Sequence, residues 1–137
     1  MYDIFDAADV RFGANMIGTA QGYPTVLWKY PTMNGSDNIT ILRVEEMHLI
    51  YAEAMLRAGD TATALTYLNN IPAIRGAAPY ASATLDNILL ERRKEFYFEG
   101  LRYDDLLRTG QGMPLIDSKK QLNDDLTGTP PAFGSYR

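Results

Sequence analysis

The sequence predicts a mainly α-helical domain in which residues 41–110 form packed helical hairpins. Apolar residues recur at helical spacing in this region, whereas they follow no sustained period elsewhere. Glycine and proline are frequent before residue 40 and after residue 109, where they should interrupt regular structure. We therefore expect one domain over residues 1–137, with a loop-rich amino-terminal segment (1–40), a helical core (41–110) and an irregular tail (111–137).

The composition is that of an ordinary globular domain, with 46% hydrophobic and 22% charged residues. A net charge of -4 argues against nucleic acid as a partner, because binding the phosphate backbone requires a basic face. The sequence has no cysteine, which excludes disulfides, thiolate metal sites and a lipid-anchoring cysteine within these residues. Residues 1–5 carry no targeting signal and look like the start of an excised domain, so we interpret the chain as part of a longer protein.

The first forty residues should be loop, with at most one short strand. Residues 26–30 are apolar and aromatic and end at Pro31, which is typical of an edge strand. The aromatic residues here are candidates for glycan binding, because aromatic faces stack on sugar rings while their polar edges form hydrogen bonds. The alternative is that they belong to the core, as most aromatic residues do. The candidates are Tyr23, Trp28 and Tyr30.

Residues 41–58 are predicted to form the first helix, because Gly59 follows as a residue suited to the left-handed conformation past a helix end. At about 100° per residue, its charged side chains fall on one narrow stripe. Apolar residues cover most of the remaining circumference, so this helix should have neighbours on more than one side. The stripe contains Arg43, Glu46, Glu53 and Arg57.

Residues 61–71 should form a second helix that packs on the first as an antiparallel hairpin. Asp60 can cap its amino-terminal end, and Pro72 should end or kink it. A single hairpin of this kind cannot bury both of its faces, which again indicates neighbours on a longer chain. The spacing of small and large residues resembles that of a tetratricopeptide repeat at Gly59, Ala64 and Leu68.

A third helix should begin at a cap formed by Ser82 or Thr84 and run to about Glu99. Gly100 weakens this helix without necessarily ending it, and residues 102–108 either continue it or form another. Helical spacing places three charged residues beside the apolar face, namely Arg92, Glu95 and Glu99, whereas Arg93 and Lys94 should point away.

Charges beside an apolar face require partners, so we expect Arg92 to meet a carboxylate of the first helix or Glu99. The alternative is a solvated stripe with ordinary i,i+3 pairs. The first interpretation predicts a structural ion-pair network of Arg43, Glu46, Glu53, Arg92, Glu99, Arg102 and Asp105.

No group of residues has the spacing that catalysis requires. Asp104 and Asp105 are neighbours on a predicted helix and diverge by about 100°, which does not suit a glycosidase pair. His48 is the only histidine, so a histidine metal cluster cannot form. The sequence contains no phosphate loop, nucleophile elbow or zinc-protease motif. It predicts neither an enzyme nor a bound cofactor or metal.

Two blocks of residues keep the order and spacing of a known family. The first block contains Arg43-Val44-Glu45-Glu46, Leu49, Ala52-Glu53-Ala54, Gly59, Ala64, Leu68-Asn69 and Ile74-Arg75. The second contains Glu91-Arg92, Glu95-Phe96, Phe98-Glu99-Gly100, Arg102, Asp105-Leu106 and Arg108-Thr109-Gly110. With these blocks the chain resembles the SusD/RagB family of nutrient-binding outer-membrane lipoproteins. Weaker similarity precedes them, at Asp9-Val10-Arg11 and Lys29-Tyr30.

The resemblance implies a mainly α-helical, tetratricopeptide-like protein of the outer membrane and cell surface that catalyses no reaction. It would capture oligosaccharides or other polymer nutrients and deliver them to a TonB-dependent, SusC-like transporter. The matched motifs are mostly scaffold positions in that family, and they name no ligand. The lipid-anchoring cysteine is absent from this chain, and Pro72 stands where many relatives have an ordinary helical residue. The alternative is a tetratricopeptide-like protein-protein interaction scaffold without a small-molecule ligand.

Overall fold

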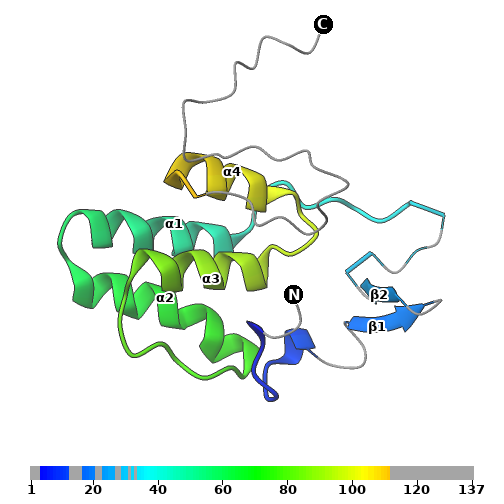
Figure 1. The fold of residues 1–137 in the computed structure, drawn as a ribbon, viewed down its shortest axis with the longest axis horizontal. Coiled ribbons are helices and arrows are strands. Elements are labelled where there is room, and N and C mark those ends of the chain that lie inside the picture. The colour runs from blue at the N-terminus through cyan, green and yellow to red at the C-terminus, as the bar shows by residue number, and fades with distance from the viewer. Residues whose placement is uncertain are drawn as a thin grey trace, which may run out of the picture. The chain divides into compact units, whose positions relative to one another are not determined.

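The computed structural model describes residues 4–12, 17–20, 23–26, 29–30, 32 and 34–111. It divides into two compact units, residues 1–95 and residues 96–137, and each is described by itself. The described part is mainly helical, which confirms the predicted fold class (Figure 1). The predicted irregular tail lies almost entirely outside the described residues.

The amino-terminal segment contains the 3₁₀ helix η2 (Val10–Phe12) and a β-hairpin of β1 (Ile17–Ala20) and β2 (Tyr23–Val26). The two strands are antiparallel, and Ile17 pairs with Val26. Of the predicted strand at residues 26–30, Val26 ends β2, Lys29 and Tyr30 lie in a bend rather than a strand, and residues 27 and 28 lie outside the described residues. Pro24 argued against a strand at this position, but each strand of a two-stranded ribbon is an edge, where proline is tolerated.

Helix α1 (Val44–Arg57) begins three residues later than predicted, because Arg43 at its amino-terminal end is still extended. Its carboxyl-terminal end is as predicted. Gly59 adopts the left-handed conformation with φ of 87°, and its backbone N–H donates to the carbonyl of Leu56. The next N–H, that of Asp60, donates to the carbonyl of Met55. These two bonds satisfy carbonyls that the helix end would otherwise leave exposed.

Helix α2 (Thr61–Arg75) starts at the predicted cap, where the Asp60 carboxylate accepts a hydrogen bond of 3.0 Å from the backbone N–H of Thr63. The predicted end at Pro72 was wrong, because the helix continues to Arg75. Pro72 lies in the last turn, so its missing N–H removes a single helical bond, and its ring is fully buried. Packing of the ring therefore offsets the local disruption. Gly76 ends the helix in the left-handed conformation.

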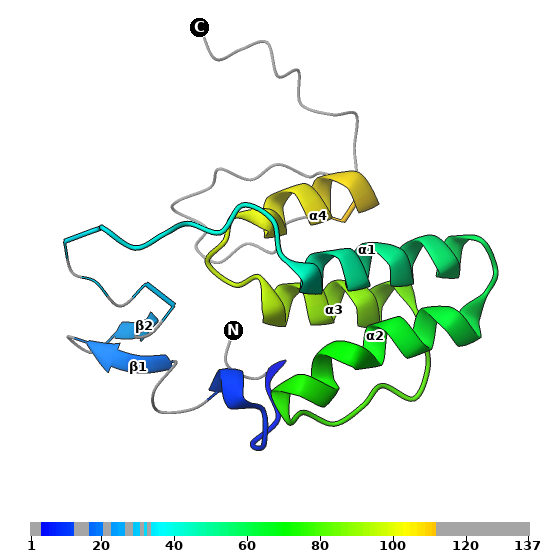
Figure 2. The ribbon, with the colours of Figure 1, turned by 180° about the vertical axis from the view of Figure 1, so that it is seen from behind.

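Helix α3 (Leu85–Glu95) is capped by Thr84, the residue before it, whose hydroxyl oxygen accepts a hydrogen bond of 3.1 Å from the backbone N–H of Asn87. Of the two predicted caps, Thr84 is the one that forms. Figures 1 and 2 show α1, α2 and α3 side by side in the first unit. Their facing sides form its core, and the side chains buried there include Leu49, Ala52, Ala64, Leu68, Ile71, Ile88 and Leu89.

The second unit contains helix α4 (Leu101–Thr109) among its described residues. The third predicted helix was too long, because α3 ends at Glu95 and Phe98 and Gly100 both have positive φ. A left-handed residue cannot continue a right-handed helix, so the chain starts a new helix after Gly100.

Candidate functional site

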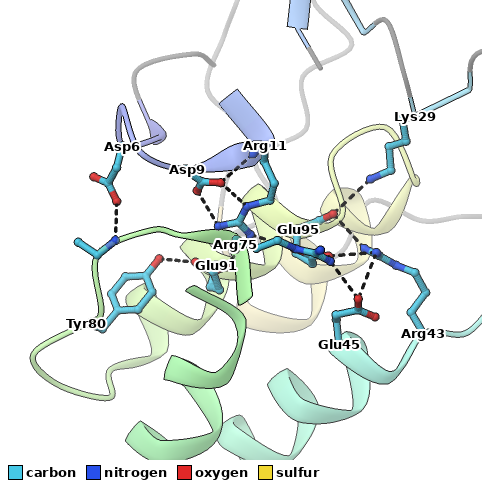
Figure 3. Close-up of polar contacts among 11 residues, drawn as sticks. Asp6, Asp9, Arg11, Lys29, Arg43, Glu45, Arg75, Tyr80, Glu91 and Glu95 are labelled. Carbon is cyan, nitrogen blue, oxygen red and sulfur yellow. Dashed lines mark hydrogen bonds and ion pairs between the residues drawn. The ribbon is translucent and has the colours of Figure 1, made fainter. Parts of the chain in front are cut away.

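Seven charged residues of the first unit contact one another and form what we call the Arg11 cluster (Figure 3). They come from four parts of the chain: the amino-terminal segment, the beginning of α1, the last turn of α2, and α3. The cluster therefore joins the segment that carries the candidate aromatic residues to the helical hairpin. Its members are Asp9, Arg11, Arg43, Glu45, Arg75, Glu91 and Glu95.

The Arg11 guanidinium is almost fully buried and contacts three carboxylates. Its Nη2 lies 2.7 Å from Asp9 Oδ2, and its Nη1 lies 2.6 Å from Glu91 Oε1 and 2.9 Å from Glu95 Oε2. Burial disfavours the charged guanidinium, but the hydrogen bonds to Asp9 and the charge of Glu91 outweigh it and raise the pKa of Arg11. Burial likewise disfavours the charged form of Asp9, but its hydrogen bonds with Arg11 outweigh this and lower its pKa.

Glu95 is contacted by three arginines. Arg75 donates to both of its carboxylate oxygens, at 3.1 and 2.6 Å, and Arg43 Nη1 lies 3.0 Å from Oε1. Arg11 is the third. Burial would raise the pKa of Glu95, but the hydrogen bonds and charge of Arg75, together with the other two arginines, lower it. Glu95 is therefore held as a carboxylate in the interior of the first unit.

The backbone carbonyl of Glu95 is a second point of contact. Glu95 is the last residue of α3, where carbonyl groups lack partners within the helix and the helix dipole is negative. Lys29 Nζ donates to this carbonyl at 3.2 Å and Arg43 Nη2 donates to it at 3.0 Å. The end of α3 therefore fixes the amino-terminal segment at Lys29, one residue before Tyr30.

Tyr80 covers the other side of Glu91. Its hydroxyl donates to Glu91 Oε2 at 2.9 Å, and its backbone forms two hydrogen bonds with the side-chain amide of Asn69 in α2. Burial, followed by the negative charge of Glu91, raises the pKa of the Tyr80 hydroxyl, so the group is held in its neutral form.

Four of the predicted network residues lie in the first unit, and each has a described ion pair there. They are Arg43, Glu46, Glu53 and Arg92. Arg92 Nη2 lies 3.5 Å from Glu46 Oε1, so α3 and α1 meet through this pair. Glu53 accepts two hydrogen bonds from Arg57 on its own helix, at 3.0 and 2.7 Å. Arg43 contacts Glu95.

The other predicted network residues lie in the second unit. There Asp105 is buried and accepts hydrogen bonds of 3.0 and 2.7 Å from Arg108. Pairing of Glu99 and Arg102 with the first helix stays a prediction.

One orientation predicted for α3 was wrong. Lys94 should have pointed to solvent, but it is buried, and its Nζ lies 5.8 Å from the centre of the Tyr80 ring. The helical pattern did not show this because Tyr80 and Arg11, which come from segments outside the predicted helices, contact α3 at Lys94 and Glu91.

Of the Arg11 cluster, the predicted site residues include Arg43 alone. Sequence reasoning did not select Asp9, Arg11, Glu45, Arg75, Glu91 or Glu95. Asp9-Val10-Arg11 was noticed through the family resemblance alone. The two residues also form a local pair, because Asp9 accepts from both the backbone and the side chain of Arg11. The Asp9-Val10-Arg11 spacing is a sequence signal for this local pair, but it does not identify the acids eighty residues away.

The three candidate glycan-binding residues differ in what the structure describes. Tyr23 begins β2, and only its backbone is described. Trp28 lies outside the described residues. Tyr30 is 38% exposed and follows Lys29, which is fixed to the end of α3.

His48 lies beside the α2 residues Asn70 and Tyr67, with its Nδ1 3.0 Å from Asn70 Nδ2. Within the part of the chain that the structure describes, no three acidic or histidine side chains are grouped as metal ligands. In the same ranges, no helix has the length and apolar character needed to cross a bilayer.

Comparison with known proteins places these features in a family. The model of the SusD family matches residues 5–133. A SusD-like carbohydrate binding protein from Bacteroides vulgatus is 28% identical, with a TM-score of 0.68 over 81% of this chain and 26% of that chain. A putative sugar binding protein from the same species is 36% identical, with a TM-score of 0.65 over 85% of this chain and 28% of that chain.

A SusD superfamily protein from Bacteroides thetaiotaomicron is 33% identical, with a TM-score of 0.64 over 78% of this chain and 28% of that chain. This chain therefore spans between a quarter and a third of the length of these solved relatives. A search of the curated proteins finds no match.

Proposed function

Because the chain belongs to the SusD family, we propose that it is part of a surface protein that binds carbohydrate and catalyses no reaction. The observation that carries this proposal is the family match over residues 5–133. Two of the similar solved structures, which are described as carbohydrate binding and sugar binding proteins, support it. The ligands would be oligosaccharides or similar polymer nutrients.

In this proposal the protein delivers its ligand to a TonB-dependent, SusC-like transporter. It acts at the cell surface, on an outer membrane to which the parent protein is lipid-anchored. Family membership supports both parts of this proposal.

We propose Tyr23, Trp28 and Tyr30 as the glycan-contacting residues. Tyr30 has the best structural support, because its ring is partly exposed and the preceding residue is bound to the end of α3. An aromatic ring held in position by a rigid element loses little conformational entropy on binding, so it can stack on a sugar ring at low cost.

The test is titration of the purified chain with a panel of oligosaccharides, followed by calorimetry and by the fluorescence of Trp28, the single tryptophan. Tyr30→Ala should weaken binding by about 2 kcal/mol if the ring is a central contact. Tyr103→Ala is the matched control, because Tyr103 is also 38% exposed but lies on α4. Equal affinities of both variants and the original chain would remove Tyr30 from the site.

The exposed face of α1 favours a second candidate function, a tetratricopeptide-like scaffold for another protein. Val44 is 70% exposed, and Met47, Ile50 and Tyr51 are between 41% and 48% exposed. Apolar residues at this spacing can receive a helix of a partner. Binding of the chain to the transporter without affinity for any glycan of the panel would favour the scaffold, whereas glycan binding that Tyr30→Ala weakens would favour the carrier.

A further inference from the structure

Thr32 and residues 34–37 are held together by hydrogen bonds in a tight turn that the proposed function does not use. The Asp37 carboxylate closes it by accepting a hydrogen bond of 2.8 Å from the backbone N–H of Thr32 and a second from the Thr32 hydroxyl. The backbone N–H of Gly35 donates to the carbonyl of Thr32 at 3.2 Å. Asn34 Oδ1 accepts from the backbone N–H of Ser36 at 3.1 Å and from its hydroxyl at 2.7 Å.

We propose that Asn34 is a site of spontaneous covalent modification, in which its side-chain amide is converted to a carboxylate. The backbone nitrogen of Gly35 attacks Cγ of Asn34 and loses its proton to water. The bond from Cγ to Nδ2 then breaks, and Nδ2 takes up a proton from water and leaves as ammonia. Water hydrolyses the resulting cyclic imide at either of its two carbonyls, which yields aspartate or isoaspartate.

Gly35 makes the nucleophile accessible. The residue is exposed, and no atom lies within 4 Å of the position that a side-chain carbon would occupy. Its φ of 73° belongs to the region that favours glycine. The nitrogen of Gly35 must give up its hydrogen bond of 3.2 Å to the Thr32 carbonyl before it attacks. It can then approach Cγ of Asn34 without a side chain in the way, and the glycine backbone can adjust as the ring closes.

Ser36 supplies the stabilisation of the reaction's intermediate. When the nitrogen attacks Cγ, negative charge develops on Oδ1, which is the atom that already accepts both hydrogen bonds from Ser36. Donors that are in place before charge develops stabilise a tetrahedral intermediate in the manner of an oxyanion hole. The turn thus combines a nucleophile that carries no side chain with a polarised amide.

The other described asparagines lack one or both of these features. Asn38 is exposed, but the β-branched Ile39 follows it. Asn69 lies in α2, where the backbone of Tyr80 holds both atoms of its amide, at 3.0 and 2.8 Å. Asn70 lies in the same helix, its Nδ2 is 3.0 Å from His48 Nδ1, and the β-branched Ile71 follows it. Asn87 lies in the first turn of α3, and its Nδ2 donates to the carbonyl of Ser82 at 2.9 Å. Asn34 should therefore react before the others.

The product should loosen the turn. A carboxylate at position 34 adds a negative charge to a turn that Asp37 already closes with its own carboxylate. Isoaspartate also carries the backbone through an extra methylene group, which alters the position of Ser36 relative to residue 34. Both effects oppose the closure of the turn two residues after Tyr30.

The experiment is incubation of the folded chain in warm, mildly alkaline buffer, followed by tryptic digestion and mass spectrometry. Cleavage after Lys29 and Arg43 places Asn34 and Asn38 in one peptide, residues 30–43, so that Asn38 is an internal control. We expect the mass of residue 34 to increase by the difference between OH and NH2, and the mass of Asn38 to stay unchanged. Isoaspartyl methyltransferase should label the part of the product that contains isoaspartate. Ser36→Ala should slow the conversion, and Asn34→Gln should abolish labelling of the peptide.

The urea-unfolded chain, incubated in parallel, shows how fast the same sequence reacts without the turn. A folded chain that stays unmodified at Asn34 while the unfolded chain converts would overturn the proposal. Conversion of Asn38 at the rate of Asn34 would overturn it as well. An unchanged rate in Ser36→Ala would remove Ser36 from the proposed mechanism.

Discussion

Arg11 Nη1 lies 2.6 Å from Glu91 Oε1, and this bond joins residues that are 80 positions apart in the sequence. The same guanidinium contacts Glu95, four residues further along α3. The amino-terminal segment is therefore bound to the interior of the first unit by buried charge, and the following predictions test how much stability this gives.

Replacing Arg11 by methionine should lower the free energy of unfolding by about 3–5 kcal/mol, because three buried carboxylates lose the cation that they share. The control is Arg57→Met, which removes one i,i+4 partner of the buried Glu53; because the Arg57 side chain is 59% exposed, this loss should be smaller. Urea denaturation followed by circular dichroism measures both values. Equal losses in the two variants would show that the Arg11 cluster is no more stabilising than a single half-exposed i,i+4 pair.

A double-mutant cycle with Arg92→Ala and Glu46→Ala should give a coupling energy of about 0.5–3 kcal/mol, because the two groups meet 3.5 Å apart in a partly buried position. The comparison cycle uses Arg92→Ala with Glu53→Ala. Its coupling should be smaller, because Glu53 accepts two hydrogen bonds from Arg57. A larger coupling with Glu53 than with Glu46 would contradict the described pairing.

Acid should destabilise the first unit through Asp9 and Glu95, whose pKa values are both lowered in the folded state. Their contribution to the free energy of unfolding is fully present above the pKa values of the unfolded chain, about 3.9 for Asp and 4.3 for Glu. It is lost as pH falls through the lower pKa values of the folded state. The free energy of unfolding measured against pH should therefore fall below about pH 4. Glu95→Gln should flatten this decline, whereas Asp104→Asn, at an exposed position, should leave it unchanged.

Tyr80→Phe should cost about 1.5–3 kcal/mol, because the variant loses a hydrogen bond to a buried carboxylate. Tyr103→Phe, at an exposed position, should have little effect. Since the pKa of Tyr80 is raised, its hydroxyl should stay protonated above the usual pKa of about 10. The ultraviolet absorbance of phenolate in an alkaline titration should show one fewer late-titrating tyrosine in Tyr80→Phe. A titration identical to that of the original chain would contradict the buried position.

Local signals predicted the helices well because their determinants are local. Gly59 and Asp60 set the end of α1 and the start of α2 through hydrogen bonds to residues within five positions. Pro72 shows the limit of such rules, because α2 continues past it with the proline ring buried, and burial depends on the rest of the fold. The predicted helix could not continue to Glu99, because Phe98 has a positive φ, which phenylalanine rarely adopts and which the sequence did not predict.

The candidate site was predicted less completely than the helices. Helical spacing placed Arg92 and Glu95 beside an apolar face, and both are buried and paired. Spacing could not identify Arg11, because no periodicity connects a 3₁₀ helix near the amino terminus with a helix eighty residues later. Lys94 was placed wrongly for the same reason, since distant segments cover its side of α3.

The separation between Arg11 and its acids also determines when the first unit can be completed during synthesis. Asp9 has already been synthesised when Arg11 is added, but Glu91 and Glu95 are added eighty or more residues later. The helical hairpin of α1 and α2 needs short-range contacts alone and can form in the meantime, whereas distant contacts are slower to form. Within this unit, the residues that leave the ribosome first are then among the last to reach their final positions, and docking of Arg11 completes the unit.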